Sequence, residues 1–301
     1  MNRLIHTLAL FALLLVAPLA RAELKVLACE PEWGALVKEL AGDKVSVYVA
    51  TTALQDPHRI EARPSLVAAA RNAGLVVCTG AELEVGWLPL LIRQSGNSAI
   101  QPGKPGHFEA AAYVRMLDVP QRLDRADGDV HAAGNPHIQT DPRNITLVAE
   151  PLARRLAELD PANAATYQAR SADFQARWKA AIQRWEQSAA PLRGVPVVVQ
   201  HKAFPYLQQW LGLVEVAALE PKPGVEPTSA HLSTVLAGLK TRPAKMILRA
   251  AYNDPRGADW LAERTQLPVV VLPFTVGGNE QAKDLFSLFD DTVQRLLKAS
   301  R

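Results

Sequence analysis

The sequence predicts an α/β protein with two lobes of mostly parallel strands and covering helices, joined by one long, rigid helix. Short valine-rich runs alternate with segments of helical spacing near both ends of the chain, whereas residues 144–188 carry helical patterns alone. Repeated strand–helix units favour parallel sheets covered by helices. The expected parts are an N-terminal lobe, a connecting helix and a C-terminal lobe, at residues 23–160, 161–188 and 189–301.

The first 22 residues are predicted to be a secretory signal peptide. Arg3 supplies a positive charge, residues 8–17 an apolar core and residues 20–22 a small-x-small cleavage site. The apolar core is shorter than the roughly 20 residues that span a bilayer. Because no cysteine follows the cleavage site, we expect no lipid anchor there. The mature chain should begin near Glu23 and be exported in soluble form to a bacterial periplasm.

The composition is ordinary for a globular protein, with 49% hydrophobic and 21% charged residues and a formal net charge of +3. The roughly 280 residues after the leader are enough for two lobes with their own cores. A nearly neutral chain without a basic run is not expected to bind nucleic acid. We expect a monomer.

The first lobe should alternate strands and helices in chain order. Strands are expected at residues 24–29, 45–50 and 75–78, and helices at residues 32–40, 64–72 and 84–94. Gly42 and Gly74 are typical residues at the ends of the first two helices, and Pro64 suits the first turn of the second.

Two cysteines, Cys29 and Cys78, each end a strand-like run. In a doubly wound sheet the first and third strands are often neighbours, and an exported protein meets an oxidising compartment. A disulfide between them is therefore sterically reasonable. Two buried free thiols are the alternative.

The middle of the chain predicts two helices. Residues 144–159 carry a leucine stripe, and Asp160 and Pro161 then supply a cap and a first-turn proline for a helix that ends near residue 188. This helix would span roughly 42 Å, longer than one lobe needs, so we interpret it as the connection between lobes. The strands expected after it lie at residues 195–200, 214–219, 245–248 and 268–272, and the helices at residues 205–211, 228–240, 256–265 and 281–299.

Three histidines lie in loops at corresponding positions. His58 follows the second strand between Pro57 and Pro64, His201 follows the first strand of the second lobe, and His137 precedes the helical middle. Open α/β sheets bind ligands beyond the carboxyl ends of their strands. Neutral imidazoles suit zinc, whereas calcium and magnesium prefer oxygen donors. The three histidines predict a shared metal site; three ordinary surface histidines are the alternative.

The segments DPHRIEARPS, GNPHIQTDP and HKAFPYL together resemble the periplasmic solute-binding proteins of ABC metal importers, the zinc and manganese cluster. ACEPEW and CTGAELEVGWLP resemble the zinc-binding branch of that cluster. The resemblance covers nearly the whole mature chain and implies that His58, His137 and His201 bind transported Zn2+. It also implies delivery to an ABC permease of the inner membrane. A periplasmic metallochaperone is a further candidate partner.

The family usually supplies an acidic fourth ligand after the last strand of the second lobe. Pro273 and Phe274 stand there in this chain, and Arg249 occupies a second position that is commonly acidic. Glu280, in a Gly-Gly loop, is the candidate fourth ligand, whereas Asp284 is expected to cap the last helix. Water or another donor is the alternative.

Some zinc-binding members carry an acidic, histidine-rich loop that captures metal. Asp124, Asp127, Asp129 and His131 are interpreted as a much reduced version of it. In particular, His131 and Asp129 are candidates for metal capture. A polar loop with an incidental histidine is the alternative.

We do not expect an enzyme, since the sequence has no phosphate-binding loop, no G-x-S-x-G elbow and no HExxH helix. One alternative is a zinc hydrolase with a three-histidine site and an open water position, with Glu280 or Glu61 as its base. The other is a two-lobed binding protein for manganese or a metal chelate. Three nitrogen donors favour zinc over manganese, which prefers oxygen.

Overall fold

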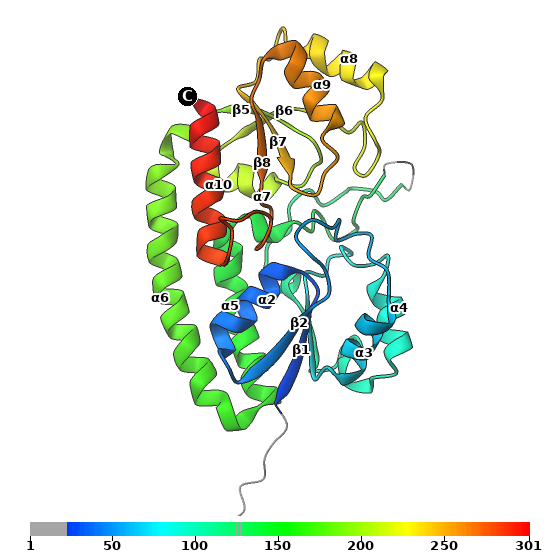
Figure 1. The fold of residues 1–301 in the computed structure, drawn as a ribbon, viewed down its shortest axis with the longest axis vertical. Coiled ribbons are helices and arrows are strands. Elements are labelled where there is room, and N and C mark those ends of the chain that lie inside the picture. Colours follow the sequence, from blue (N-terminus) through cyan, green and yellow to red (C-terminus); the bar gives the residue numbers. More distant parts are fainter. Residues whose placement is uncertain (1–22, 125, 127) are drawn as a thin grey trace, which may run out of the picture.

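The fold is a pair of α/β lobes, each built on a sheet of four parallel strands (Figure 1). A computed structural model describes residues 23–301 except residues 125 and 127. The predicted signal peptide and Asp127 therefore lie outside the described residues. The predicted fold class is confirmed. The exact limits predicted for the lobes stay predictions.

The first sheet has the strand order β2-β1-β3-β4, and every neighbouring pair is parallel. Its strands are β1 (Leu24–Ala28), β2 (Val45–Val49), β3 (Leu75–Cys78) and β4 (His107–Glu109). Its helices are α2 (Pro31–Ala41), α3 (Pro64–Asn72) and α4 (Leu88–Ser95). Successive β1 residues point to opposite faces, so Val26 packs in the core shared with α2, whereas Leu27 packs in the core beneath α3 and α4.

The second sheet repeats this topology, with the order β6-β5-β7-β8 and parallel pairing throughout. Its strands are β5 (Pro196–Val199), β6 (Val214–Ala218), β7 (Met246–Ala250) and β8 (Val269–Leu272). Its helices are α7 (Pro205–Leu211), α8 (Ser229–Gly238), α9 (Arg256–Thr265) and α10 (Leu285–Ser300). The two lobes are topologically equivalent, although no repeat is evident in their sequences.

The predicted connecting helix is present as α6 (Ala164–Ser188), preceded by a 3-10 turn at Pro161–Asn163. It follows α5 (Pro142–Leu159) and runs along one side of both lobes (Figure 1). Its buried residues recur every three or four positions: Tyr167, Ser171, Phe174, Trp178, Ala181 and Trp185. Neither α6, with its 25 residues, nor any other helix in the described part of the chain is long and apolar enough to cross a membrane.

Two helix starts were predicted too early. The helix expected from residue 84 begins at Leu88, because the Glu84 carboxylate accepts the backbone N–H groups of Thr79 and Gly80 at 2.7 and 3.1 Å and closes a turn. The helix expected from residue 281 begins at Leu285, where the predicted cap Asp284 forms a capping box with the third helical residue.

Strand β4 was not predicted. Its three residues follow a stretch rich in glycine and proline, and so short a segment carries no periodic pattern. It pairs with β3 and completes the first sheet.

A disulfide joins Cys29 and Cys78, whose Cα atoms lie 4.8 Å apart. The cysteines follow β1 and end β3, which are neighbouring strands as expected. The bond therefore connects the two strands in the buried centre of the first lobe.

Candidate metal centre

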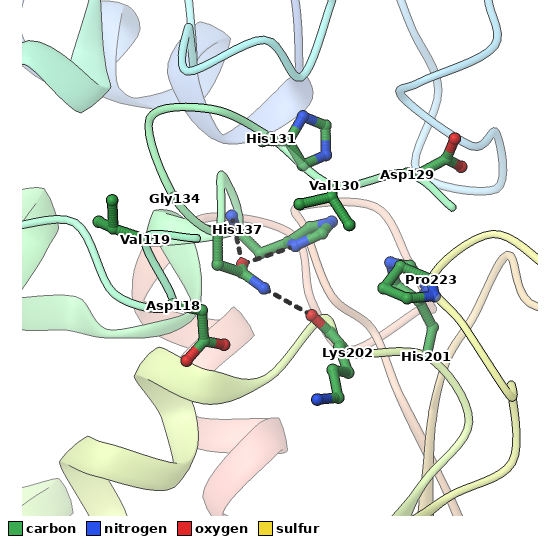
Figure 2. Close-up of a pocket in the computed structure, with 11 residues that line it drawn as sticks. Asp118, Val119, Asp129, Val130, His131, Gly134, His137, His201, Lys202 and Pro223 are labelled. Atoms are coloured by element: carbon green, nitrogen blue, oxygen red, sulfur yellow. Dashed lines mark hydrogen bonds between the residues drawn. The ribbon is translucent and has the colours of Figure 1, made fainter. Parts of the chain in front are cut away.

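Four histidine rings gather where the two lobes meet. The ring centroid of His58 lies 5.4 Å from those of His131 and His137 and 6.1 Å from that of His201. The centroids of His137 and His201 are 5.5 Å apart. Figure 2 shows His131, His137 and His201 around one pocket. The three histidines predicted to share a site thus lie together, and the ring of His131 lies beside that of His58.

The elements of both lobes position these side chains. His58 lies in the loop after β2, His137 shortly before α5, and His201 just after β5. Two of these loops extend from the carboxyl ends of strands in different lobes, as the general rule for open α/β sheets predicts. Helix α5 starts at Pro142, which fixes the end of the loop that carries His137.

Three of the rings are oriented by an oxygen acceptor on Nδ1. The acceptors are Asp56 Oδ1 for His58 at 2.7 Å, Asn135 Oδ1 for His137 at 2.9 Å and Glu220 Oε2 for His201 at 2.7 Å. An oxygen at Nδ1 keeps the proton there and leaves the Nε2 lone pair free to bind a metal.

The Nε2 nitrogens of two of these rings have no other hydrogen-bond partner in the described part of the chain and are therefore suited to bind a metal. The Nε2 atoms of His58 and His137 are buried and make no hydrogen bond to any described residue. Such buried polar atoms are costly unless a ligand or ion satisfies them. An ion bound between these two atoms would satisfy both of them.

Electrostatics favours the metal-binding form of the rings. Burial, reinforced by the neighbouring His58, lowers the pKa of His137 well below its usual value and that of His131 to about 4. Both imidazoles are therefore neutral near pH 7, the form that coordinates metal ions. Burial acts to raise the pKa of Asp56, but its hydrogen bond to His58 outweighs this and the pKa falls below its usual range.

The histidine nitrogens are close without being at coordination spacing. Within the described residues, the set of donor atoms that all lie within 4.8 Å of one another is that of Cys29, Cys78 and Glu84, and there the two sulfurs are bonded to each other. Zinc–nitrogen bonds are about 2.0–2.1 Å long. The histidine rings must therefore turn or move to bind one ion.

A cavity of about 400 Å³ opens onto the histidines. It is larger than a bare ion requires, so it admits a hydrated one. Its lining includes His131, His137 and His201 and the charged residues Asp118, Asp129 and Lys202 (Figure 2).

The predicted fourth ligand gains no support from this geometry. Glu280 is exposed, and its neighbour Asn279 is hydrogen bonded at 2.7 Å to Asp291 on α10. The ring of Phe274 instead faces that of His137 at 5.6 Å between centroids. An apolar side chain thus stands where the resemblance leads one to expect an acid. The role of Glu280 stays a prediction.

The side chains that orient the rings were missed from the sequence, although two of them had a signal. Asp56-Pro57-His58 and Asn135-Pro136-His137 share one local pattern. In both, the side-chain oxygen of the first residue also accepts the backbone N–H of the histidine, at 3.0 and 3.1 Å. Glu220 had no local signal, since it lies 19 positions from His201.

Comparison with known proteins gives the context of this site. Residues 26–299 match the family model described as zinc-uptake complex component A, periplasmic. The chain is 26% identical over 271 residues to the high-affinity zinc uptake system protein ZnuA of Paracoccus denitrificans, covering 79% of each protein. It is 23% identical over 290 residues to the manganese ABC transporter substrate-binding lipoprotein PsaA of Streptococcus pneumoniae, covering 91% of this chain and 90% of that protein.

Solved structures share the fold over nearly the whole length. A crystal structure of ZnuA superposes with a TM-score of 0.76 at 22% identity, covering 92% of this chain and 99% of the other. A ZnuA deletion mutant with zinc bound gives a TM-score of 0.75 at 25% identity, covering 92% and 98%. Similar proteins are named for zinc and for manganese, so the comparisons do not distinguish the two ions.

Proposed function

The chain belongs to the periplasmic zinc-uptake component A family, whose members are metal-binding proteins of ABC importers, and we propose that its own cargo is Zn2+. Zn2+ would bind between the lobes to the Nε2 atoms of His58, His137 and His201. After export and removal of the leader, the monomeric protein would deliver the ion to an inner-membrane permease. A periplasmic metallochaperone is a candidate donor.

The observation that carries the choice of zinc is the donor set. Neutral imidazole nitrogens face the site, and the nearby carboxylates of Asp56 and Glu220 are engaged with Nδ1 atoms behind the rings. Zinc accepts such a nitrogen-rich site, whereas manganese prefers more oxygen. Of the two ions named for similar proteins, the geometry favours zinc.

The same arrangement supports release as well as capture. His201 lies in the second lobe and His58 in the first, so a small displacement of one loop separates donors of a single ion. Protons compete with metal for imidazole, so affinity should fall as the pH drops through the histidine range. Because α6 packs along both lobes, we expect loop movement with modest lobe tilting and no large hinge closure.

A hydrolase is not favoured by the site. The bases considered for it, Glu61 and Glu280, are both exposed, and hydrolysis needs a base beside a metal-bound water. Asp56 and Glu220 are closer to the histidines, but they hold ring nitrogens.

The test is a comparison of zinc and manganese binding to metal-free protein by calorimetry with a competing chelator. Zinc should bind far more tightly than manganese. Alanine at His58, His137 or His201 should weaken zinc binding by more than about 100-fold, since even residues that only orient ligands cost 10–100-fold. His231→Ala, outside the cluster, is the matched control. Full zinc retention by all three variants would rule out the site, and tighter manganese binding would rule out the choice of ion.

A further inference from the structure

The segment of residues 128–136, here called the strap, connects the two lobes beside the histidines. On the first-lobe side, the Ala132 N–H donates to Glu82 Oε2 at 2.6 Å, and Asp129 lies 3.9 Å from the Arg59 guanidinium. These contacts hold the strap against the loops that follow β2 and β3.

On the second-lobe side, the strap is fixed by hydrogen bonds to backbone carbonyls. The Asp129 N–H donates to the Pro223 carbonyl at 2.8 Å, and Asn135 Nδ2 donates to the Lys202 carbonyl at 2.7 Å. Gly128 has φ +84°, and a Cβ atom there would lie 2.3 Å from the Pro223 oxygen. Only glycine permits this approach.

The strap places His131 within the histidine cluster. Its ring stacks on that of His58 with a centroid separation of 5.4 Å and an interplanar angle of 27°, and it lines the cavity beside His137 and His201. Four imidazoles around one zinc ion have centroids roughly 5 Å apart, given zinc–nitrogen bonds of about 2.0–2.1 Å in a tetrahedron. The separation between the His131 and His58 centroids, 5.4 Å, is close to that value.

A fourth nitrogen donor would complete the coordination of the ion. Zinc held by three histidines has one tetrahedral position left. Of the other cavity-lining groups, Asp129 pairs with Arg59, whereas His131 contacts a ring of the cluster itself.

We propose that His131 is the fourth ligand of the bound ion, and that metal binding thereby fastens the strap between the lobes. The inference rests on the proposed function. The sequence suggested that His131 helps to capture the metal; here His131 coordinates the bound ion directly. Removal of this one ligand would open the strap and leave an exit path for the ion.

The first experiment measures coordination directly. When zinc is added to metal-free full-length protein, the ¹⁵N chemical shifts of the His131 ring should move, together with those of His137. A shift of His137 without one of His131 overturns the inference and leaves the proposed function intact. If neither ring responds, both fail. This measurement needs no variant that must fold.

The second experiment uses His131→Ala and His131→Gln, with His231→Ala as control. Both substitutions should weaken zinc binding about tenfold or more and alter the visible absorption of the Co2+-substituted protein, because one nitrogen donor is replaced by water. Unchanged affinity and an unchanged Co2+ spectrum overturn the inference, provided that His137→Ala still loses zinc.

The third experiment displaces the strap without touching a ligand. Gly128→Ala should weaken zinc binding because its Cβ pushes the strap from Pro223, and it should add nothing to His131→Ala. Gly103→Ala is the matched control, since Gly103 also has positive φ but has no atom within 4 Å of the added Cβ. Additive losses in the double variant contradict a strap that acts through His131.

Discussion

At the scale of single residues, a short local motif builds much of the site. An Asp or Asn two positions before a histidine, with proline between, turns the chain and holds both the backbone N–H and the ring Nδ1 of that histidine. The rings of His58 and His137 are thereby oriented by hydrogen bonds within their own loops.

A second group of residues, three buried glutamates, makes the first lobe sensitive to pH. Burial raises the pKa of Glu32 and of Glu84 to about 7, and burial together with the nearby Glu84 raises that of Glu30 well above its usual value. Glu30 accepts a hydrogen bond from Thr79 at 3.2 Å. A carboxyl group with a raised folded-state pKa keeps its proton up to a higher pH in the folded protein than in the unfolded chain.

This raised pKa gives a signed prediction for Glu30→Gln. Between about pH 4.5 and the folded-state pKa, the unfolded chain has released the Glu30 proton and the folded protein has not, so native stability falls as pH rises, by up to about 1.4 kcal/mol per pH unit. Glutamine does not titrate, so the variant lacks this pH-dependent loss of stability. The stability of Glu30→Gln relative to the native protein should therefore increase from pH 5.5 to pH 8, as measured by urea unfolding of metal-free protein.

Two features make that comparison specific. The lowered pKa values of His131 and His137 act in the opposite direction, but they are present in both proteins and cancel in the difference. Glu263→Gln, at an exposed position, should show no such pH-dependent difference. A constant or shrinking advantage of Glu30→Gln with rising pH would contradict the assignment.

At the scale of secondary-structure elements, α6 contributes a continuous aromatic face to the core. The ring of Trp178 lies 5.3 Å from Phe174, 5.2 Å from Trp185 and 5.6 Å from Phe289 of α10, between centroids. Its indole N–H donates to the Pro142 carbonyl at the start of α5, at 2.8 Å. One side chain thus links the connecting helix to an element of each lobe.

Trp178→Ala should therefore destabilise the whole protein. We expect a loss of about 3–5 kcal/mol in the free energy of unfolding, because a large side chain is removed from a site that cannot collapse around the cavity. Denaturant unfolding measures it. Lys179→Ala, at the exposed adjacent position, should change stability by less than about 0.5 kcal/mol. Equal effects of the two variants would show that α6 contributes no core.

At the scale of the whole molecule, the inner faces of both sheets share one core. The same buried cluster contains Val26 and Val77 of the first sheet, Val199 and Leu248 of the second, and Phe174 of α6. The lobes are thus bound together by packing as well as by chain connection. Such continuity favours cooperative unfolding and limits independent lobe motion.

Zinc should consequently stabilise both lobes in a single transition. Free zinc at 100 times its Kd would add about 2.7 kcal/mol to the free energy of unfolding, because it binds the folded state alone. Calorimetric scans with zinc and with excess chelator measure the shift, and His137→Ala should abolish it. Two separate transitions, with one insensitive to zinc, would contradict a shared core and a site made by both lobes.

The sequence by itself determined the fold class, the order of nearly all strands and helices, the long helix and three histidines of the cluster. Hydrophobic periodicity, capping residues and short motifs are local properties, because each depends only on residues that lie close together in the sequence. Even Asp284 could be assigned as a cap from its position alone.

Only the tertiary structure decided what depends on contacts between distant segments. It added β4, whose three residues are defined by pairing with β3, and it oriented His201 through Glu220. It also brought His131 to His58, 73 positions earlier in the chain, and left Glu280 on the surface. Local patterns cannot specify such neighbours, because they are fixed by how two lobes pack around a shared core.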